Sequence, residues 1–384
     1  MKKNSLKILF TGGGSGGHVI PVIAIVRELR RINAGKNLEL YYFGPKDDFG
    51  EIFLSQEDIK IKNILAGKLR RNTDWKSFLN NFIDIFFKIP LGIIQSFFMV
   101  LFLFPDLIFS KGGYGSLPVV IAGRMLFRPI FIHESDVSPG TANRFASKFA
   151  KETMVSFVQT EYFSLEKMIV VGNPIRKEIL EGSKKEAEEM FKLNYDRPVL
   201  LILGGSQGAQ RINDKILELL PTLLDSFEII LQCGENNYQQ VKAEAKITIE
   251  RFGTLESAFH LYPFLKEQEI RQAYAAADLI VSRAGSGSIF EIAANGKPSV
   301  LVPLPLPESA QNHQVKNAYA YGETKACLVM EENNFTVRFF LEKLRYLFSN
   351  PSELDKMRKA AKEFSRPESA RIISQRILNY LSKK

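Results

Sequence analysis

The sequence predicts an α/β protein of two doubly wound domains, in which short parallel strands alternate with helices. Its 384 residues are enough for two domains with separate cores. Short runs of leucine and β-branched residues alternate with segments of helical periodicity, as in parallel sheets covered by helices. Three strands are followed by glycine-rich turns that open a helix, at residues 11–17, 111–116 and 204–209.

Composition and charge limit the class of protein. Hydrophobic residues make up 45% of the chain and charged residues 24%, which is typical of a globular protein. The net charge of +9 favours nucleic acid, a phosphorylated ligand or an anionic membrane as partner, although many basic proteins are simply soluble enzymes. Cys233 and Cys327 lack the spacing of a metal site or a disulfide framework. No cleavable apolar segment opens the chain, so a cytoplasmic protein is expected.

The first glycine turn connects a predicted strand, 6–11, to a helix that has Pro21 near its start. It does not match the dinucleotide fingerprint, because the acidic residue in range, Glu39, falls inside the next predicted strand. A nicotinamide enzyme is therefore a weak interpretation. His18 stands where the turn meets the helix and is placed to face a ligand of the turn, and a structural role fits it as well as a catalytic one.

Residues 68–104 combine a basic loop with many phenylalanines. The apolar run 91–104 would be about 21 Å long as a helix, which is shorter than the roughly 30 Å hydrocarbon core of a membrane. Extending the run backward brings in Asp84, Lys88 and Pro90, so we do not expect a membrane span. Two interpretations remain, a buried helix or an apolar patch that enters a membrane surface with cations around it.

Polar side chains follow the strands predicted at 106–110 and 129–132, and the carboxyl ends of parallel strands border the ligand crevice. Glu134 is the first candidate carboxylate there, although a solvated loop acid fits the same position. The strand predicted at 168–171 leads to Arg176, whose guanidinium can bind a phosphate. We expect the domains to be 1–173 with a C-terminal helix at about 366–384, and 174–365.

The second domain begins with the strand 199–203 and a glycine turn. The N-terminal end of the helix that follows this turn is expected to bind a phosphate. A second turn of small residues opens a helix that carries Glu291. This carboxylate suits a ribose diol, but an acid that complements the helix dipole fits equally well. His313 and Gln314 offer the mixed donors and acceptors that sugar hydroxyls require.

Taken in order, these motifs resemble those of the MurG family, the bacterial glycosyltransferases of family 28. The resemblance spans nearly the whole chain through residues 13–18, 133–134, 172–176, 204–209, 286–291 and 313–314. It implies a GT-B fold, with two Rossmann-like domains facing across a cleft. It further implies inverting transfer of N-acetylglucosamine from UDP-GlcNAc to the 4-hydroxyl of the muramyl sugar of lipid I, giving lipid II. Because lipid I carries undecaprenyl diphosphate, the enzyme would be peripheral on the cytoplasmic face of the inner membrane.

The resemblance also implies roles for individual residues. His18 is expected as the general base, with Glu134 as the alternative. In the family, Asp136 is usually an asparagine that contacts the sugar; aspartate keeps an acceptor and adds charge near a diphosphate. No cofactor and no metal ion are expected. The residues assigned to substrate binding are Ser15, Gly16, Gly17, Asp136, Arg176, Ser206, Gln207, Ser286, Gly287, Ser288, Glu291, His313 and Gln314.

Three other functions stay open on the sequence alone. Another GT-B enzyme, such as a diglucosyl- or monogalactosyl-diacylglycerol synthase, shares the layout and a membrane acceptor. A non-catalytic nucleotide-sugar-binding or scaffold protein of the cell-wall machinery would bind UDP-GlcNAc without turnover. The basic charge permits a nucleic-acid binder, but no binding motif for RNA or DNA is present, so we expect none. Proteins of cell-wall synthesis are candidate partners.

Overall fold

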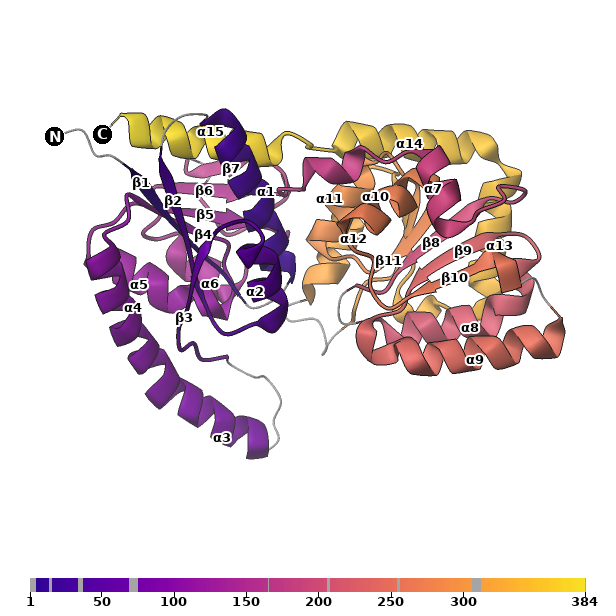
Figure 1. Ribbon diagram of the computed structural model, residues 1–384, viewed down its shortest axis with the longest axis horizontal. Coiled ribbons are helices and arrows are strands. Elements are labelled where there is room, and N and C mark those ends of the chain that lie inside the picture. Colours follow the sequence, from indigo (N-terminus) through magenta and orange to yellow (C-terminus); the bar gives the residue numbers. More distant parts are fainter. Residues whose placement is uncertain are drawn as a thin grey trace. The chain divides into compact units, whose positions relative to one another are not determined.

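The chain forms two compact units, which a computed structural model describes (Figure 1). Unit 1 comprises residues 1–176 and 367–384, and unit 2 comprises residues 177–366. The structure describes residues 5–13, 16–33, 37–68, 75–164, 166–205, 208–253, 256–305 and 312–383, apart from the side chains of Phe49 and Lys76.

Unit 1 is built on a seven-stranded parallel sheet with the strand order β3-β2-β1-β4-β5-β6-β7. The central strands β1, β4 and β5 are buried on both faces because helices cover the sheet on each side. The strands are β1 (Leu6–Thr11), β2 (Leu38–Gly44), β3 (Lys60–Asn63), β4 (Leu107–Ser110), β5 (Ile130–Glu134), β6 (Glu152–Val155) and β7 (Met168–Val170).

Alternate residues of β1 face two different helical layers. Ile8 and Phe10 pack with α1 (Gly16–Ile32) and α15 (Ser369–Ser382), whereas Leu9 packs with α4 (Ile89–Leu103) and α5 (Leu117–Met125). The C-terminal helix α15 is thus part of unit 1, and Ser374 Oγ donates a 3.0 Å hydrogen bond to Ile25 O of α1. The other helices of unit 1 are α2 (Asp48–Ser55), α3 (Trp75–Ile83) and α6 (Thr141–Ala146).

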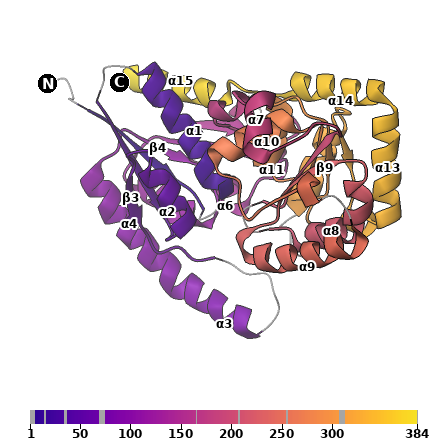
Figure 2. The same cartoon turned by 45° about the vertical axis from the view of Figure 1, so that its right-hand side comes forward.

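Unit 2 has a six-stranded parallel sheet with the order β10-β9-β8-β11-β12-β13. Its strands are β8 (Val199–Leu203), β9 (Glu228–Gln232), β10 (Phe259–Tyr262), β11 (Leu279–Ser282), β12 (Ser299–Leu301) and β13 (Cys327–Val329). Its helices, most of which are labelled in Figure 2, are α7 (Lys184–Phe191), α8 (Gln210–Leu224), α9 (Tyr238–Phe252), α10 (Glu267–Ala276), α11 (Ser286–Ala294), α12 (His313–Gly322), α13 (Val337–Ser349) and α14 (Pro351–Phe364).

Each sheet has one point at which the strand order reverses. β1 lies between β2 and β4, and β8 lies between β9 and β11. In open parallel sheets, ligands bind outside the carboxyl ends of the strands at this switch point. The turns after β1, β4, β8 and β11 are the glycine- or small-residue turns singled out in the sequence. The predicted class, two doubly wound α/β domains, is confirmed.

The apolar segment of unit 1 differs from the sequence expectation. α3, a π-helical turn (Asp84–Lys88) and α4 form one uninterrupted helix, and Ser77–Leu103 is long and apolar enough to cross a membrane by length and composition. Its 27 residues correspond to about 40 Å. The prediction of a helix too short to span was therefore wrong, because the π turn carries Asp84 and Lys88 without ending the helix. Figure 1 shows α3 projecting away from the sheet.

One narrow face attaches α4 to unit 1. Gly92, Ser96 and Val100 are buried at four-residue spacing, and a side chain at Gly92 would place its Cβ 2.0 Å from Leu65 O. Only 17% of the 18-residue apolar window is buried, so the buried-helix interpretation is wrong for most of this surface. The exposed apolar residues are Trp75, Phe78, Leu79, Phe82, Ile83, Ile85, Phe86, Phe87, Leu91, Ile94, Phe98, Leu101, Phe102 and Phe104.

Candidate active site

In unit 1, the ends of β1, β4 and β5 bring together side chains from distant parts of the sequence. His18 lies at the start of α1, Lys111 directly after β4, and Glu134 at the end of β5 with Asp136 in the following turn. Lys111 and Asp136 both act electrostatically on His18. The structure therefore gathers the two candidate bases and Asp136 at the switch point of one sheet.

The His18 ring is held between two glycine turns. A Cβ at Gly13 would lie 2.7 Å from His18 Cδ2, and a Cβ at Gly113 would lie 2.9 Å from His18 Nε2. Gly113 also has φ +79°, a left-handed conformation that favours glycine. Both turns must therefore be free of side chains for the imidazole to occupy this place.

Burial lowers the pKa of His18 to about 4, and the positive charge of Lys111 contributes in the same direction. The carboxylate of Asp136 and a backbone hydrogen bond at Lys111 act against this shift. His18 is consequently a neutral imidazole at physiological pH, with a nitrogen that can accept a proton. His133, by contrast, is buried within β5, and its Nε2 lies 2.9 Å from Gly172 O, which gives it a structural role.

Glu134 uses both carboxylate oxygens to shape the turn between β5 and α6. Its Oε1 accepts from Asp136 N at 3.0 Å, and its Oε2 accepts from Gly140 N at 3.2 Å and Asn143 Nδ2 at 2.9 Å. Burial, followed by the nearby charge of Asp136, raises the pKa of Glu134 to about 7. With three donors engaged, this carboxylate is better suited to organising the turn than to receiving a proton from a substrate.

Several neighbours of this site were not found by sequence reasoning. The Lys111 ammonium donates a hydrogen bond to Ser135 Oγ, which donates to Asn173 Oδ1 at 3.0 Å. Asn143 joins Glu134 to the backbone of β5 through its bond to His133 O at 3.2 Å. The sequence offered one signal for Lys111, which is its position directly after an apolar strand and before two glycines. Its burial could not be predicted, because a local sequence pattern does not show which side chains at the ends of strands are buried.

In unit 2, α11 begins at the switch point after β11, with Ser286, Gly287 and Ser288 in its first turn. Glu291 lies one turn further along the same helix. Its Oε2 accepts a 3.0 Å hydrogen bond from the hydroxyl of Tyr274, a buried residue of α10 that sequence reasoning did not select.

The other predicted binding residues occupy three places. Gln314, in the first turn of α12 after His313, accepts a 3.0 Å hydrogen bond from Leu304 N and so adjoins the exit of β12. Arg176 is buried at the end of the first segment of unit 1. Gly16 and Gly17 open α1. Ser15, Ser206 and Gln207 lie outside the described residues.

Two arginines and a glutamate form a cluster of ion pairs at the strand ends of unit 2. Arg283, directly after β11, pairs with Glu332 and donates a 3.2 Å hydrogen bond to Val302 O beyond β12. Arg211, in the first turn of α8, pairs with the other oxygen of the same glutamate. These contacts connect the turns after β8 and β11, which are those expected to hold the nucleotide.

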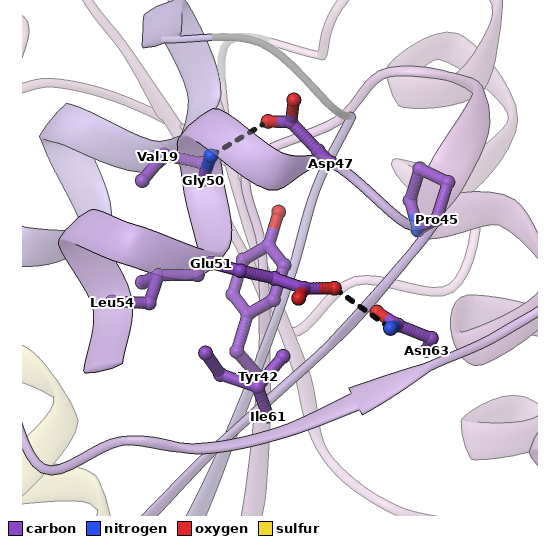
Figure 3. A pocket seen from close by; sticks show the side chains of 9 residues that line it. All are labelled: Val19, Tyr42, Pro45, Asp47, Gly50, Glu51, Leu54, Ile61 and Asn63. Atoms are coloured by element: carbon purple, nitrogen blue, oxygen red, sulfur yellow. Dashed lines mark hydrogen bonds between the residues drawn. The ribbon is translucent and has the colours of Figure 1, made fainter.

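A cavity between α2 and the outer strands of unit 1 is not a substrate site. Its volume of about 10 Å³ is roughly the minimum for a single water molecule. Figure 3 shows that its acids serve the local fold, since Asp47 caps α2 through Gly50 N and Glu51 accepts from Asn63 Nδ2. Among the described residues, no three His, Cys, Asp or Glu side chains are grouped so that they could hold a metal ion.

Comparison with known proteins identifies the family. Residues 8–155 match the glycosyltransferase family 28 N-terminal domain, and residues 199–373 match the glycosyltransferase family 28 C-terminal domain. The chain belongs to glycosyltransferase family 28. A protein of Clostridium tetani is 34% identical over 91% of both chains, and one of Clostridium kluyveri is 35% identical over 92% of this chain and 95% of its own. Both are named UDP-N-acetylglucosamine--N-acetylmuramyl-(pentapeptide) pyrophosphoryl-undecaprenol N-acetylglucosamine transferase.

Solved structures agree on the fold of this family 28 chain. MurG of Acinetobacter baumannii matches 97% of this chain and 99% of its own with a TM-score of 0.72 at 24% identity. A UDP-GlcNAc 2-epimerase of Neisseria meningitidis matches with a TM-score of 0.68 at 16% identity, over 97% of this chain and 100% of its own. At such identities the structures show the fold alone, and the fold does not distinguish transfer from epimerisation. The sequence relatives make that distinction, and the predicted identification as a glycosyltransferase of this family is confirmed.

Proposed function

We propose that the chain transfers N-acetylglucosamine from UDP-GlcNAc to the 4-hydroxyl of the muramyl sugar in N-acetylmuramyl-(pentapeptide) pyrophosphoryl-undecaprenol, with inversion. One observation carries this proposal. Relatives that bear the corresponding name align with more than 90% of this chain at 34–35% identity, so the similarity includes both units and both sets of glycine turns. Such a reaction forms one bond to the anomeric carbon as the bond to UDP breaks.

We assign the donor to the switch point of unit 2. The N-terminal ends of α8 and α11 supply backbone N–H groups and a partial positive charge for the UDP diphosphate. Glu291 accepts hydrogen bonds from the ribose, and His313 and Gln314 receive the sugar. Donors of this kind are worth about 10²–10³ each in rate, because they stabilise the charge that grows on the departing UDP.

The acceptor hydroxyl is assigned to the switch point of unit 1, where His18 takes its proton. Neutral His18 can do so at physiological pH, whereas Glu134 is engaged by three hydrogen-bond donors. Asp136 lies close enough to raise the pKa of His18, so it stabilises the imidazolium that forms as the proton is taken up.

Measuring UDP release tests the proposal. We expect release only when UDP-GlcNAc and the undecaprenyl-linked muramyl acceptor are both present, with a disaccharide-bearing lipid as the product. Release with diacylglycerol in place of that acceptor would indicate a glycolipid synthase. Binding of UDP-GlcNAc without turnover of either acceptor would indicate a non-catalytic binding protein.

The pH dependence of kcat/KM distinguishes the two candidate bases, because a base acts only when deprotonated and the rate falls as pH drops below its pKa. The pKa of His18 is about 4 and that of Glu134 about 7. With His18 as the base, we expect kcat/KM to fall only a few-fold between roughly pH 7 and pH 5.5, because protonation of Glu134 weakens the hydrogen bonds of the 135–140 turn but leaves the base in place. A steeper decline, about 15-fold over that interval and approaching tenfold per pH unit below it, would assign the role to Glu134.

The Tyr274→Phe variant tests the ribose contact. Removal of the hydroxyl that orients Glu291 should weaken UDP binding about threefold to tenfold, measured by calorimetry, and leave kcat unchanged. The affinity of the variant for a UDP analogue without ribose hydroxyls should equal that of the unsubstituted protein. Tyr321→Phe is the matched control, since Tyr321 is fully buried in α12 and its hydroxyl has no hydrogen-bond partner among the described residues. Equal weakening of UDP and the analogue would contradict the assignment.

We also propose that the exposed face of α3 and α4 docks on an anionic membrane surface, where the lipid-linked acceptor would lie. The helix exposes its aromatic and aliphatic residues, and Arg128, which follows α5, lies against the residue that ends α4. Arg128 stacks over the Phe104 ring at 3.8 Å, and Arg124 lies 5.9 Å from the Phe127 ring. An apolar face bordered by cations is typical of helices that lie in the membrane interface.

Replacement of Phe98 and Leu101 by serine should weaken binding to anionic vesicles without lowering Tm, because these side chains are 51% and 38% exposed. Vesicle sedimentation and thermal denaturation measure the two effects. Ile247→Ser with Phe252→Ser is the control, since it removes similarly exposed apolar residues from α9 of unit 2. A large fall in Tm for the first variant would mean that α4 belongs to the core.

A further inference from the structure

A buried lysine at the strand ends of unit 1 has no role in the transfer reaction described above. Lys111 is only 2% exposed, and its backbone N–H donates a 2.8 Å hydrogen bond to Thr11 O at the end of β1. Its ammonium reaches Ser135 of the β5–α6 turn, and Ser135 reaches Asn173 beyond β7. Lys111 thus connects the ends of four strands. Because it is so thoroughly covered, it acts on a ligand only through its neighbours.

The charges around Lys111 explain why an ammonium is tolerated there. A buried cation is unfavourable unless opposite charge lies close to it. Glu134 and Asp136 both raise the pKa of Lys111, against the larger effect of burial, which lowers it to about 8. The two carboxylates also repel each other, and Asp136 raises the pKa of Glu134. The lysine offsets this repulsion.

Loss of this positive charge would affect the whole turn. Glu134 would then take up a proton more readily, and a neutral carboxyl is a weaker acceptor for Asp136 N, Gly140 N and Asn143 Nδ2. These three bonds fix the 135–140 turn, which carries Asp136 close to His18. The position of Asp136 therefore depends on the charge state of Glu134.

We propose that Lys111 is a positioning residue for the acceptor site: by holding Ser135 and balancing the charges of Glu134 and Asp136, it keeps the 135–140 turn in its active shape. The inference rests on the proposed function, because the turn affects turnover only if the acceptor reacts at unit 1. The inference also explains why position 136 can carry an aspartate, because the ammonium of Lys111 compensates the negative charge that the aspartate adds next to Glu134.

A double-mutant cycle tests the inference. Lys111→Met should lower kcat/KM for the acceptor about tenfold or more, leave the KM for UDP-GlcNAc unchanged, and lower Tm by about 5 °C. When Asp136→Asn is already present, adding Lys111→Met should reduce kcat/KM and Tm much less, since the carboxylate repulsion has been removed. Lys60→Met is the control for loss of a lysine from the same sheet, because Lys60 is exposed on β3 and should change neither quantity.

The cycle gives a definite answer. If Lys111→Met reduces kcat/KM by the same factor with Asp136 and with asparagine at that position, or has no effect in either, the inference is overturned. If the unsubstituted protein shows no turnover with UDP-GlcNAc and the muramyl lipid, the proposed function fails instead. The Tm cycle would still report whether Lys111 and Asp136 are coupled in the folded protein.

Discussion

The His18→Ala variant is expected to lose a factor of about 10²–10⁴ in kcat, the usual contribution of a positioned general base. This corresponds to about 3–5 kcal/mol of transition-state stabilisation. The KM for UDP-GlcNAc should stay close to its original value, because the donor is assigned to unit 2 and His18 belongs to unit 1. Steady-state kinetics with both substrates varied would measure the two constants separately.

A His18→Gln variant is the control for the space that the ring fills. Glutamine retains hydrogen-bonding groups but cannot serve as a base near neutral pH, so the loss of kcat should match that of alanine. Reduced affinity for UDP-GlcNAc with kcat intact would show that His18 positions a ligand and takes no proton.

The second large effect is expected for Gly113→Ala, which should lower kcat about 10²-fold by displacing the His18 ring. The new Cβ would lie 2.9 Å from His18 Nε2 and 3.0 Å from the backbone of Gly13, so the imidazole or its turn must move. The backbone of Gly113, with φ +79° and ψ 165°, lies in a region that essentially only glycine adopts, so alanine adds strain of about 1–3 kcal/mol and Tm should fall as well. Kinetics and thermal denaturation on one preparation measure both effects.

Gly253→Ala separates the strain from the displacement. Gly253 caps the end of α9 with φ +62°, and a Cβ there would meet no atom of the described residues within 4 Å. This variant should therefore lose stability through the strain of a positive φ but keep its kcat. Wild-type kcat for Gly113→Ala would mean that the second glycine turn does not set the position of His18.

Much of the fold could be predicted because the strands at the centre of each sheet are locally distinctive. β1 and β8 coincide with the predicted strands, since strands buried on both faces appear as continuous apolar runs. β3 was not assigned, because its sequence Lys60–Asn63 contains a single apolar residue and three of its four residues are exposed. A strand at the edge of a sheet is recognised by its pairing with a neighbour, which a local pattern does not contain.

The apolar segment shows a second limit of local reasoning. Its composition is visible in the sequence, but the length of the helix and the face that it buries are not. A π turn lets the helix continue through Asp84 and Lys88, where the carboxylate is buried and paired with the lysine at 2.7 Å. That pairing, together with the contact of Lys68 N with the same carboxylate, depends on the loop that packs against the helix.

The sequence by itself determined the doubly wound fold class, the turns at both switch points and the family, because each depends on residues that are adjacent in the chain. Only the tertiary structure decided that Glu134 shapes a turn, that Lys111 is a buried cation and that Tyr274 orients Glu291. The physical reason is that burial and charge act through space, and the groups that shift the pKa of His18 lie on strand ends about 90 and 120 residues away along the chain.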